Sequence, residues 1–274
     1  MEQKTLVNKI LSFLKKSGNL ALEYQDKLNF KVKTDASIVT EADLAISKIF
    51  REDFNEYLSL NNHKLLDEEN LPSREDFFED KCEYLWTLDP IDGTTTYFNG
   101  FPLWAIGLSL YKNFEPYMGF IYMPSTQELI YTDGEKSYYI KNAFAENKVK
   151  TELVLQDREL TKKSIILQHR LKNYDVNKLV VLDLYSSYVL SFYTLIGKSL
   201  ATFFNKPMKL WDITATLPIC KNIGMSFKNL RTGEIVKNLK DLSIDENWYL
   251  SNEYLMCDNK VFDNIITELK INNI

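Results

Sequence analysis

The chain has 274 residues, of which 45% are hydrophobic and 26% charged, a composition typical of a globular protein that can bury a large core. Its 33 basic and 38 acidic residues give a net charge of −5, so we expect neither nucleic acid nor an anionic membrane as a partner. Cys82, Cys220 and Cys257 are too few and too widely spaced for a disulfide framework or a zinc site, which is typical of a reducing compartment.

The N-terminal segment predicts a helix over residues 5–28, because Leu6, Ile10 and Leu14 recur at helical spacing. Lysines interrupt every apolar run there, so the segment does not resemble a secretion signal. No stretch of the chain reaches the length of a transmembrane helix. We therefore expect a cytoplasmic enzyme or binding protein.

A second helix is predicted over residues 39–60, after a β-rich hairpin or loop with the sequence FKVKTDASIVTEAD. Thr40 is the expected N-cap, and Glu41 and Asp43 stand in the first turn, where the helix dipole favours negative charge. A short strand then ends in three acids, Asp67, Glu68 and Glu69. Residues 70–83 are a charged connector, and EYLWTL is a buried strand that ends at Leu88.

Beyond the segment that follows Leu88, the period of hydrophobic residues changes to two. The stretches LWAIGLSLY, EPYMGFIYM, ELIYT and SYYIK are separated by turn signals and predict an antiparallel meander. Past residue 150, strands and helices alternate: the predicted strands are SIILQ, LATFF and NWYLS, and the predicted helices cover residues 183–197, 212–223 and 259–270.

These elements predict two parts, an α+β part over residues 1–150 and an α/β part over residues 151–274, with the boundary in the polar stretch 145–152. The first part carries most candidate ligands, and the second carries Asp212 and the residues on the substrate side.

The stretch LDPIDGTTTYFNG, from Leu88 to Gly100, combines two features that would oppose each other without a cation. Gly93 permits a tight turn, and the threonines after it open a short helix, whose free N–H groups are a site for anions. Asp89 and Asp92 would repel such an anion unless a divalent cation lay between them. Oxygen ligands without histidine or cysteine favour Mg²⁺ or Mn²⁺ over zinc.

Two aspartates cannot complete a two-metal site, so further acids are needed. The candidates are the acidic run of residues 67–69 and Asp212, at a later helix start. Taken alone, the acidic run is most simply a solvated loop, and Asp212 is most simply an N-cap.

Four motifs together resemble the inositol monophosphatase superfamily of metal-dependent, lithium-sensitive phosphatases. Its signature W-x-x-D-P-I-D-G-T-T-x-F matches Trp86 to Phe98, and its W-D-x-[SA]-A motif is similar to Trp211 to Ala215. Glu68-Glu69 meets the E-E motif, and Glu69 lies at the expected spacing from Asp89. The K-x-D-x-S form of several branches is similar to the stretch that begins at Lys33.

The resemblance implies a layered αβαβα sandwich and assigns roles to individual residues. The implied metal ligands are Glu69, Asp89, the Ile91 carbonyl, Asp92 and Asp212, with Glu68 left open. The implied phosphate contacts are the N–H groups of Gly93, Thr94 and Thr95, and the Thr94 hydroxyl is implied to help activate the attacking water.

The partner of Thr94 in water activation is an aspartate before the V-T pair of the motif. One branch places it where this chain has Ser37, and the K-x-D-x-S branch places it at Asp35, so we predict Asp35. Asp67 replaces the usual glycine or serine and is expected to add charge near the metals. Asn205 replaces a sugar-contacting acid of the inositol-specific branch, which leaves the substrate open.

The resemblance therefore implies a phosphoric monoester hydrolase that uses two or three Mg²⁺ ions, for which Mn²⁺ can substitute, and water as the nucleophile. Its partner would be a small phosphorylated substrate, and we expect a homodimer. Two alternatives stay open. One is a 3′(2′),5′-bisphosphate nucleotidase or histidinol-phosphate phosphatase, and the other is an inactive regulator that binds metal or phosphate.

Overall fold

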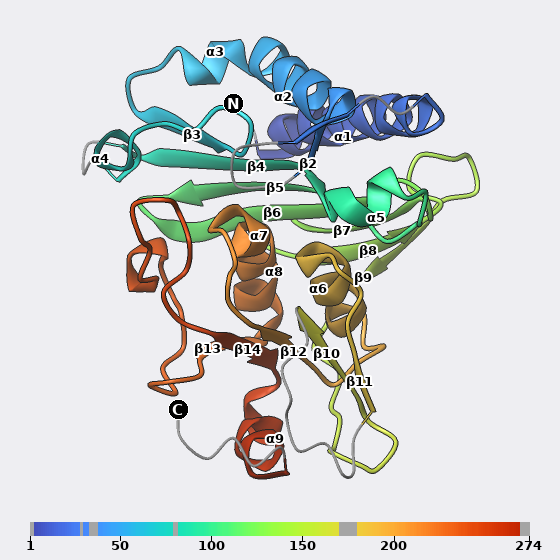
Figure 1. Ribbon diagram of the computed structural model, residues 1–274, viewed down its shortest axis with the longest axis vertical. Helices are drawn as coiled ribbons and strands as arrows, with labels where there is room; N and C mark the ends of the chain where they lie inside the picture. Colours follow the sequence, from blue (N-terminus) through green and yellow to red (C-terminus); the bar gives the residue numbers. More distant parts are fainter. Residues whose placement is uncertain (1–2, 28–29, 33–37, 79–81, 170–179, 269–274) are drawn as a thin grey trace.

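The computed structural model describes residues 3–27, 30–32, 38–78, 82–169 and 180–268 (Figure 1). Helices and sheets alternate in layers: α1 and α2 cover one face of a seven-stranded sheet, α6, α7 and α8 lie between this sheet and a five-stranded one, and α9 lies beyond the second sheet. This is the predicted layered αβαβα arrangement. No helix in the described part of the chain is long and apolar enough to cross a bilayer.

The described helices are α1 (Gln3–Gln25), α2 (Glu41–Asp53), α3 (Asn55–Leu58), α4 (Arg74–Phe77), α5 (Thr94–Phe98), α6 (Ser187–Leu195), α7 (Trp211–Thr214), α8 (Thr216–Ile223) and α9 (Phe262–Glu268). The prediction of one helix over residues 39–60 is wrong. The helix is interrupted at Phe54, which caps the end of α2 and the start of α3. The ring of Phe54 is fully buried, with its centroid 5.9 Å from that of Phe13 in α1 and 5.4 Å from that of Trp86, so the break coincides with a residue held in the core.

The seven-stranded sheet runs in the order β3-β4-β5-β6-β7-β8-β9, and only the β3–β4 pair is parallel. Its strands are β3 (His63–Asp67), β4 (Tyr84–Asp92), β5 (Ala105–Lys112), β6 (Glu115–Met123), β7 (Glu128–Thr132), β8 (Ser137–Lys141) and β9 (Val149–Glu152). The predicted meander is confirmed as β5 to β8. Strand β9 falls in the polar stretch that we predicted as a boundary, and it forms the edge of the sheet.

The five-stranded sheet runs in the order β11-β10-β12-β14-β13, and it is mixed. Its strands are β10 (Ile165–His169), β11 (Val180–Leu182), β12 (Ala201–Phe204), β13 (Ser226–Asn229) and β14 (Tyr254–Cys257). The strand predicted at NWYLS is wrong: residues 247–251 form only isolated bridges, and the neighbouring Tyr254–Cys257 segment pairs with β12 and β13 instead. A separate hairpin, β1 (Phe30–Val32) with β2 (Ile38–Thr40), leads into α2.

Strand β4 is the central scaffold of the site. From Leu85 to its end at Asp92 it is buried, with α2 on one face and α7 on the other. Trp86 packs its fully buried ring against Phe50 and Phe54, and its Nε1–H donates to His63 Nδ1 at 3.0 Å. On the α7 side, Thr87 shares a hydrogen bond of 2.6 Å with Thr214. The strand that ends in the acidic motif is therefore held from both layers.

Candidate metal centre

The end of β4 bends where the acidic motif begins. The register with β5 shifts between Asp89 and Asp92, and the chain then turns at Gly93 with φ 86° to start α5. A Cβ at Gly93 would lie 2.8 Å from the Ser186 Cβ and 3.0 Å from the Leu103 carbonyl oxygen. Both the left-handed backbone and the close approach require glycine here. The strand is longer than predicted, because it continues through Asp92 instead of ending at Leu88.

Three aspartates converge at this bend. Asp89 and Asp92 come from β4, and Asp212 comes from the first turn of α7. Each offers a carboxylate oxygen, and the three oxygens all lie within 4.8 Å of one another. Asp89 and Asp92 are buried, with 2% and 7% of their surface exposed, and Asp212 is half-buried. The fold therefore brings Asp212, from a distant segment, beside Asp89 and Asp92.

Burial and mutual repulsion set the electrostatics of these acids. Burial raises the pKa of Asp89 well above its usual value, and the charges of Glu68, Asp92, Asp212 and Asp43 raise it further. The pKa of Asp212 is also raised, chiefly by burial and then by the charge of Asp92. Such a cluster is costly without a cation, because each negative charge disfavours the next.

The donor chemistry fits a hard divalent cation. Oδ1 of Asp89 is fully buried and has no hydrogen-bond partner among the described residues. A buried carboxylate oxygen without a partner is unusual in proteins and is a natural position for a metal ligand. The clustered ligand atoms are all carboxylate oxygens, which suit Mg²⁺ better than zinc.

Asp92 has a second task, because it holds the start of α6. Its Oδ1 accepts from the Ser187 N–H at 3.2 Å and from the Ser187 hydroxyl at 2.8 Å. Its Oδ2 accepts from the Tyr188 N–H at 2.6 Å and from the Ser186 hydroxyl. Burial raises the pKa of Asp92, and these hydrogen bonds oppose that rise. Residues at the start of α6 thereby orient an acid of β4.

The acidic turn after β3 differs from the prediction. The side chain of Asp67 is fully buried, and its Oδ2 accepts hydrogen bonds from the Ser47 hydroxyl and from Arg51 of α2. The expectation that Asp67 adds charge near the metals is therefore wrong, because its charge is paired with a guanidinium. Its Oδ1 accepts from the Glu69 N–H at 3.2 Å, which fixes the turn.

The two glutamates of this turn have different surroundings. Glu68 raises the pKa of both Asp89 and Asp212, so its charge acts directly on the cluster. Glu69 lines a surface pocket of 620 Å³ together with Ser47 and Arg51 of α2. Both glutamates raise the pKa of Asp43. Glu68 therefore has the stronger electrostatic effect on the pKa values of Asp89 and Asp212.

Asp43 is a buried acid that the sequence analysis identified only as a first-turn residue. Burial raises its pKa to about 8, with further contributions from Glu68 and Glu69. Its Oδ2 accepts from the Thr40 N–H at 2.8 Å and from the Thr40 hydroxyl at 2.5 Å. In the sequence, Asp43 stands three residues after Thr40, and a capping box is enough to explain this spacing. No separate signal in the sequence indicated that the Asp43 side chain borders the acidic cluster.

The remaining predicted residues occupy the following positions. Ile91 is buried, and its carbonyl accepts from the Thr94 hydroxyl at 3.1 Å. Thr94 is half-buried and Thr95 is exposed at the start of α5. Asn205 is fully buried directly after β12. Asp35 and Ser37 lie outside the described residues.

Solved structures support the same fold. An inositol monophosphatase (IMPase) from Thermotoga maritima superposes with a TM-score of 0.77 at 19% identity and covers 97% of each chain. An IMPase/NADP phosphatase solved with Mg²⁺ and phosphate superposes with a TM-score of 0.76 at 17% identity and covers 100% of this chain and 98% of its own.

Curated relatives match over shorter segments. The fructose-1,6-bisphosphatase/inositol-1-monophosphatase of Thermotoga maritima is 30% identical over 125 residues, 45% of each chain. The 3′(2′),5′-bisphosphate nucleotidase CysQ of Haemophilus influenzae is 30% identical over 120 residues, 43% of this chain and 44% of its own. The matched segments thus span just under half the length of these relatives. Over nearly the whole chain, residues 3–271 match the model of the inositol monophosphatase family, and the protein belongs to that family.

Proposed function

We propose that the protein hydrolyses a small phosphate monoester with the help of Mg²⁺. The observation that carries this proposal is the cluster of Asp89, Asp92 and Asp212, which joins two family motifs and leaves one buried Asp89 oxygen without a partner among the described residues. Bound Mg²⁺ would supply Lewis acidity toward a phosphoryl oxygen and a water molecule. The same cluster without catalysis would be an inactive regulator, which an activity assay distinguishes.

The proposed metal ligands are Asp89, Asp92, Asp212 and the Ile91 carbonyl, together with one glutamate of the acidic turn. The sequence favours Glu69 by its spacing, whereas the charge of Glu68 acts on Asp89 and Asp212. We therefore propose Glu68 as the first candidate and keep Glu69 as the second. The number of ions, two or three, and the use of Mn²⁺ belong to this proposal.

The proposed phosphate contacts are the N–H groups of Gly93, Thr94 and Thr95 at the start of α5. The left-handed turn at Gly93 brings this backbone directly after the acids of β4. The carboxylates would repel a phosphoryl group held by these N–H groups unless a cation lay between the negative charges. The proposed phosphate contacts therefore depend on the proposed metal.

Two aspartates are candidates for the group that accepts a proton from water. Asp35 follows from the sequence motif. Asp43 is favoured by its place, because its carboxylate is buried and its charge acts on Asp89 of the cluster. The Thr94 hydroxyl would help to orient the water.

The substrate class is broader than inositol phosphate. Asn205 lacks the negative charge of the acid that contacts the sugar in the inositol-specific branch, and it is buried at the end of β12. One relative is a bisphosphate nucleotidase, and one solved relative is described as an IMPase/NADP phosphatase. We include a bisphosphate nucleotide and a 2′-phosphorylated dinucleotide as candidate substrates. A cytoplasmic homodimer is the proposed form of the enzyme.

A panel of phosphate esters tests the function. Inositol 1-phosphate, fructose 1,6-bisphosphate, a 3′,5′-bisphosphate nucleotide, NADP and histidinol phosphate are assayed for phosphate release with 5′-AMP as a reference, with and without chelator. We expect Mg²⁺-dependent release from at least one ester, lost with EDTA and restored by excess Mg²⁺. Release that persists after complete removal of metal contradicts the metal role, and no release from any ester with Mg²⁺ bound favours the regulator.

A further inference from the structure

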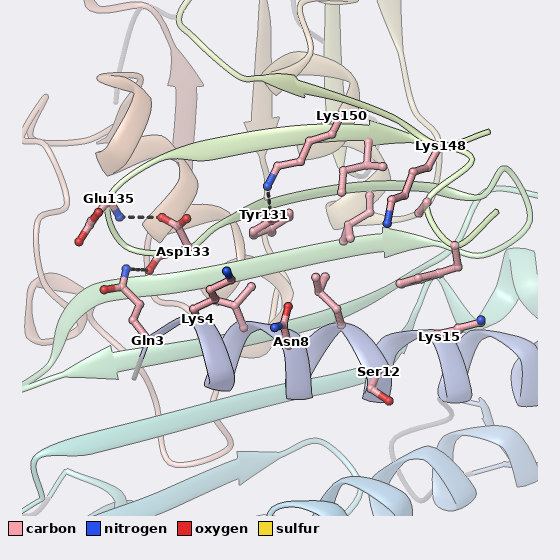
Figure 2. Close-up of a pocket in the computed structure, with 16 residues that line it drawn as sticks. Gln3, Lys4, Asn8, Ser12, Lys15, Tyr131, Asp133, Glu135, Lys148 and Lys150 are labelled. Carbon is pink, nitrogen blue, oxygen red and sulfur yellow. Dashed lines mark hydrogen bonds between the residues drawn. The ribbon is translucent and has the colours of Figure 1, made fainter. Parts of the chain in front are cut away.

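A second pocket, unrelated to the acidic cluster, lies between α1 and the far strands of the seven-stranded sheet (Figure 2). Its volume is 760 Å³, within the range of small-molecule sites. None of its lining residues belongs to the acidic cluster or to the turns around it. Its lining residues come from α1 on one side and from β7, β8, β9 and the turns between these strands on the other.

The floor of this pocket is apolar. The buried side chains of Leu129 in β7 and Ile140 in β8 line it together with Leu11 of α1. The α1 wall runs from Gln3 to Lys15, roughly 18 Å at 1.5 Å per helical residue. An elongated apolar body about that long would bury its surface here, which is the main driving force for such binding.

The charged side chains around the pocket differ between its two ends. Lys15 and Lys148 lie at one end, whereas Asp133 and Glu135 lie at the other together with Lys4 (Figure 2). Among the described residues, no ion pair or hydrogen bond engages the side chains of Lys4, Lys15 or Lys148. These unpaired ammonium groups stand out in a chain of net charge −5. The carboxylate of Asp133, by contrast, already accepts hydrogen bonds from the N–H groups of Glu135 and Lys136.

The central part of the pocket carries a further polar contact. Lys150 donates from Nζ to the Tyr131 hydroxyl at 2.8 Å and lies 3.4 Å from the centroid of the Tyr138 ring. Its ammonium is therefore committed to the wall, while Lys15 and Lys148 remain available to a ligand. Lysine is well suited to an anionic head group because it presents a compact charge on a flexible stem.

We propose that this pocket binds an elongated anionic amphiphile. Its carboxylate or sulfonate head lies between Lys15 and Lys148, and its apolar body lies over Leu11, Leu129 and Ile140. This binding does not depend on the proposed phosphatase activity, because the two sites share no residue.

The test uses 1-anilinonaphthalene-8-sulfonate, an apolar anion that fluoresces when its ring is buried, and decanoate as a competitor, with the full chain in metal-free buffer. We expect saturable binding of one probe per chain and displacement by decanoate. Lys15→Glu/Lys148→Glu should weaken probe affinity by about tenfold or more, since two attractive charges become repulsive. Leu11→Gln should weaken it without changing the charge.

The matched control is Lys162→Glu/Lys163→Glu, which makes the same charge change on an exposed loop away from the pocket. An unchanged melting temperature shows that each variant is folded. Equal loss of affinity in both charge variants overturns the proposal, as does probe binding that never saturates. Displacement by inorganic phosphate as effective as that by decanoate also overturns it, because phosphate has no apolar body. Probe affinity that falls as protein concentration rises assigns the face to a second copy of the chain instead.

Discussion

Arg51 and Asp67 form an ion pair in which the guanidinium donates from Nη2 at 2.9 Å and from Nε at 3.1 Å to a single carboxylate oxygen. Asp67 is fully buried, whereas Arg51 is partly exposed. Nη2 also donates to the Asn70 carbonyl at 3.2 Å, so Arg51 binds both ends of the turn that presents Glu68 and Glu69. Helix α2 thereby fixes the acidic turn that presents Glu68 and Glu69.

Replacing Arg51 with methionine should destabilise the metal-free protein by about 3–5 kcal/mol, because a buried carboxylate loses its charge partner. Arg51→Met/Asp67→Asn should be less destabilised than the sum of the single variants, since neither charge is then left alone. Denaturant unfolding measures both. Lys221→Met, which breaks the exposed pair with Glu115, is the control and should cost less than about 1 kcal/mol. Equal effects of Arg51→Met and the control would contradict the role of the buried pair.

The two glutamates of the turn give a matched comparison. Glu68→Gln should raise the Mg²⁺ concentration that gives half-maximal activity by about tenfold or more, because it removes a charge that acts on Asp89 and Asp212. Glu69→Gln should raise it less. Steady-state rates against Mg²⁺ concentration, with the Mg²⁺-induced rise in melting temperature as a second readout, decide between them. The reverse order would restore Glu69 as the ligand.

Asp92→Asn should affect turnover and stability together. The amide removes a negative charge from the metal centre and turns an NH₂ group toward donors at the start of α6, so we expect a loss of at least about 10²-fold in kcat and a destabilisation of about 1–3 kcal/mol without metal. Ser187→Ala is the control for the cap, since it removes one of these hydrogen bonds but keeps the charge. It should cost about 1 kcal/mol and leave kcat within a few-fold. Near-normal turnover in Asp92→Asn would remove Asp92 from the site.

Asp43→Asn and Asp35→Asn separate the two candidates for water activation. The true proton acceptor should lose about 10²-fold or more in kcat when its carboxylate becomes an amide, with little change in Mg²⁺ requirement. We expect the larger loss in Asp43→Asn, because this carboxylate is buried beside the cluster. The amide oxygen of that variant can still accept from Thr40, so the start of α2 is preserved. Ser37→Ala is the control for the loop and should be nearly neutral.

The metal-free protein should lose stability as the pH rises. The pKa of Asp43 is ordinarily 3.8 and is about 8 in the folded chain. At a pH between these two values, Asp43 holds its proton in the folded chain and has released it in the unfolded chain. Its contribution to stability is thus greatest at low pH and declines through this window. Asp89 and Asp212, whose pKa values are also raised, add to the same slope.

We therefore expect the melting temperature in EDTA to fall between about pH 5.5 and about pH 8.5. Saturating Mg²⁺ should flatten or reverse this trend, since it binds the ionised carboxylates. Thermal unfolding at matched ionic strength measures both series, and Asp43→Asn should reduce the slope in EDTA. A metal-free melting temperature that rises steadily across this range would contradict the raised pKa values.

The sequence by itself determined the features that depend on neighbouring residues. The segment from Asp89 to Thr95 includes two aspartates and the glycine of a turn, so an acidic turn that could bind a cation was predicted from a few consecutive residues. The meander was equally accessible, because apolar runs separated by turn signals are features of neighbouring residues. The expected period of two does not appear in the burial of β5 to β7, which is nearly continuous, since helices cover both faces of the sheet. A capped helix after Thr40 followed from the capping pattern for the same reason.

The tertiary structure alone decided which distant groups meet and which way each acid faces. Asp92 receives hydrogen bonds from Ser187 and Tyr188, which lie 95 and 96 positions along the chain, and no local pattern specifies that contact. Asp67 turns toward Arg51 because the side chains of Ser47 and Arg51 in α2 reach the end of β3, and this direction depends on how two elements meet. Asp43 is a helix-capping residue in the sequence and becomes a buried acid with a pKa of about 8 only when β4 and the acidic turn close around it. Desolvation and charge repulsion arise from neighbours in space, and only the folded chain supplies them.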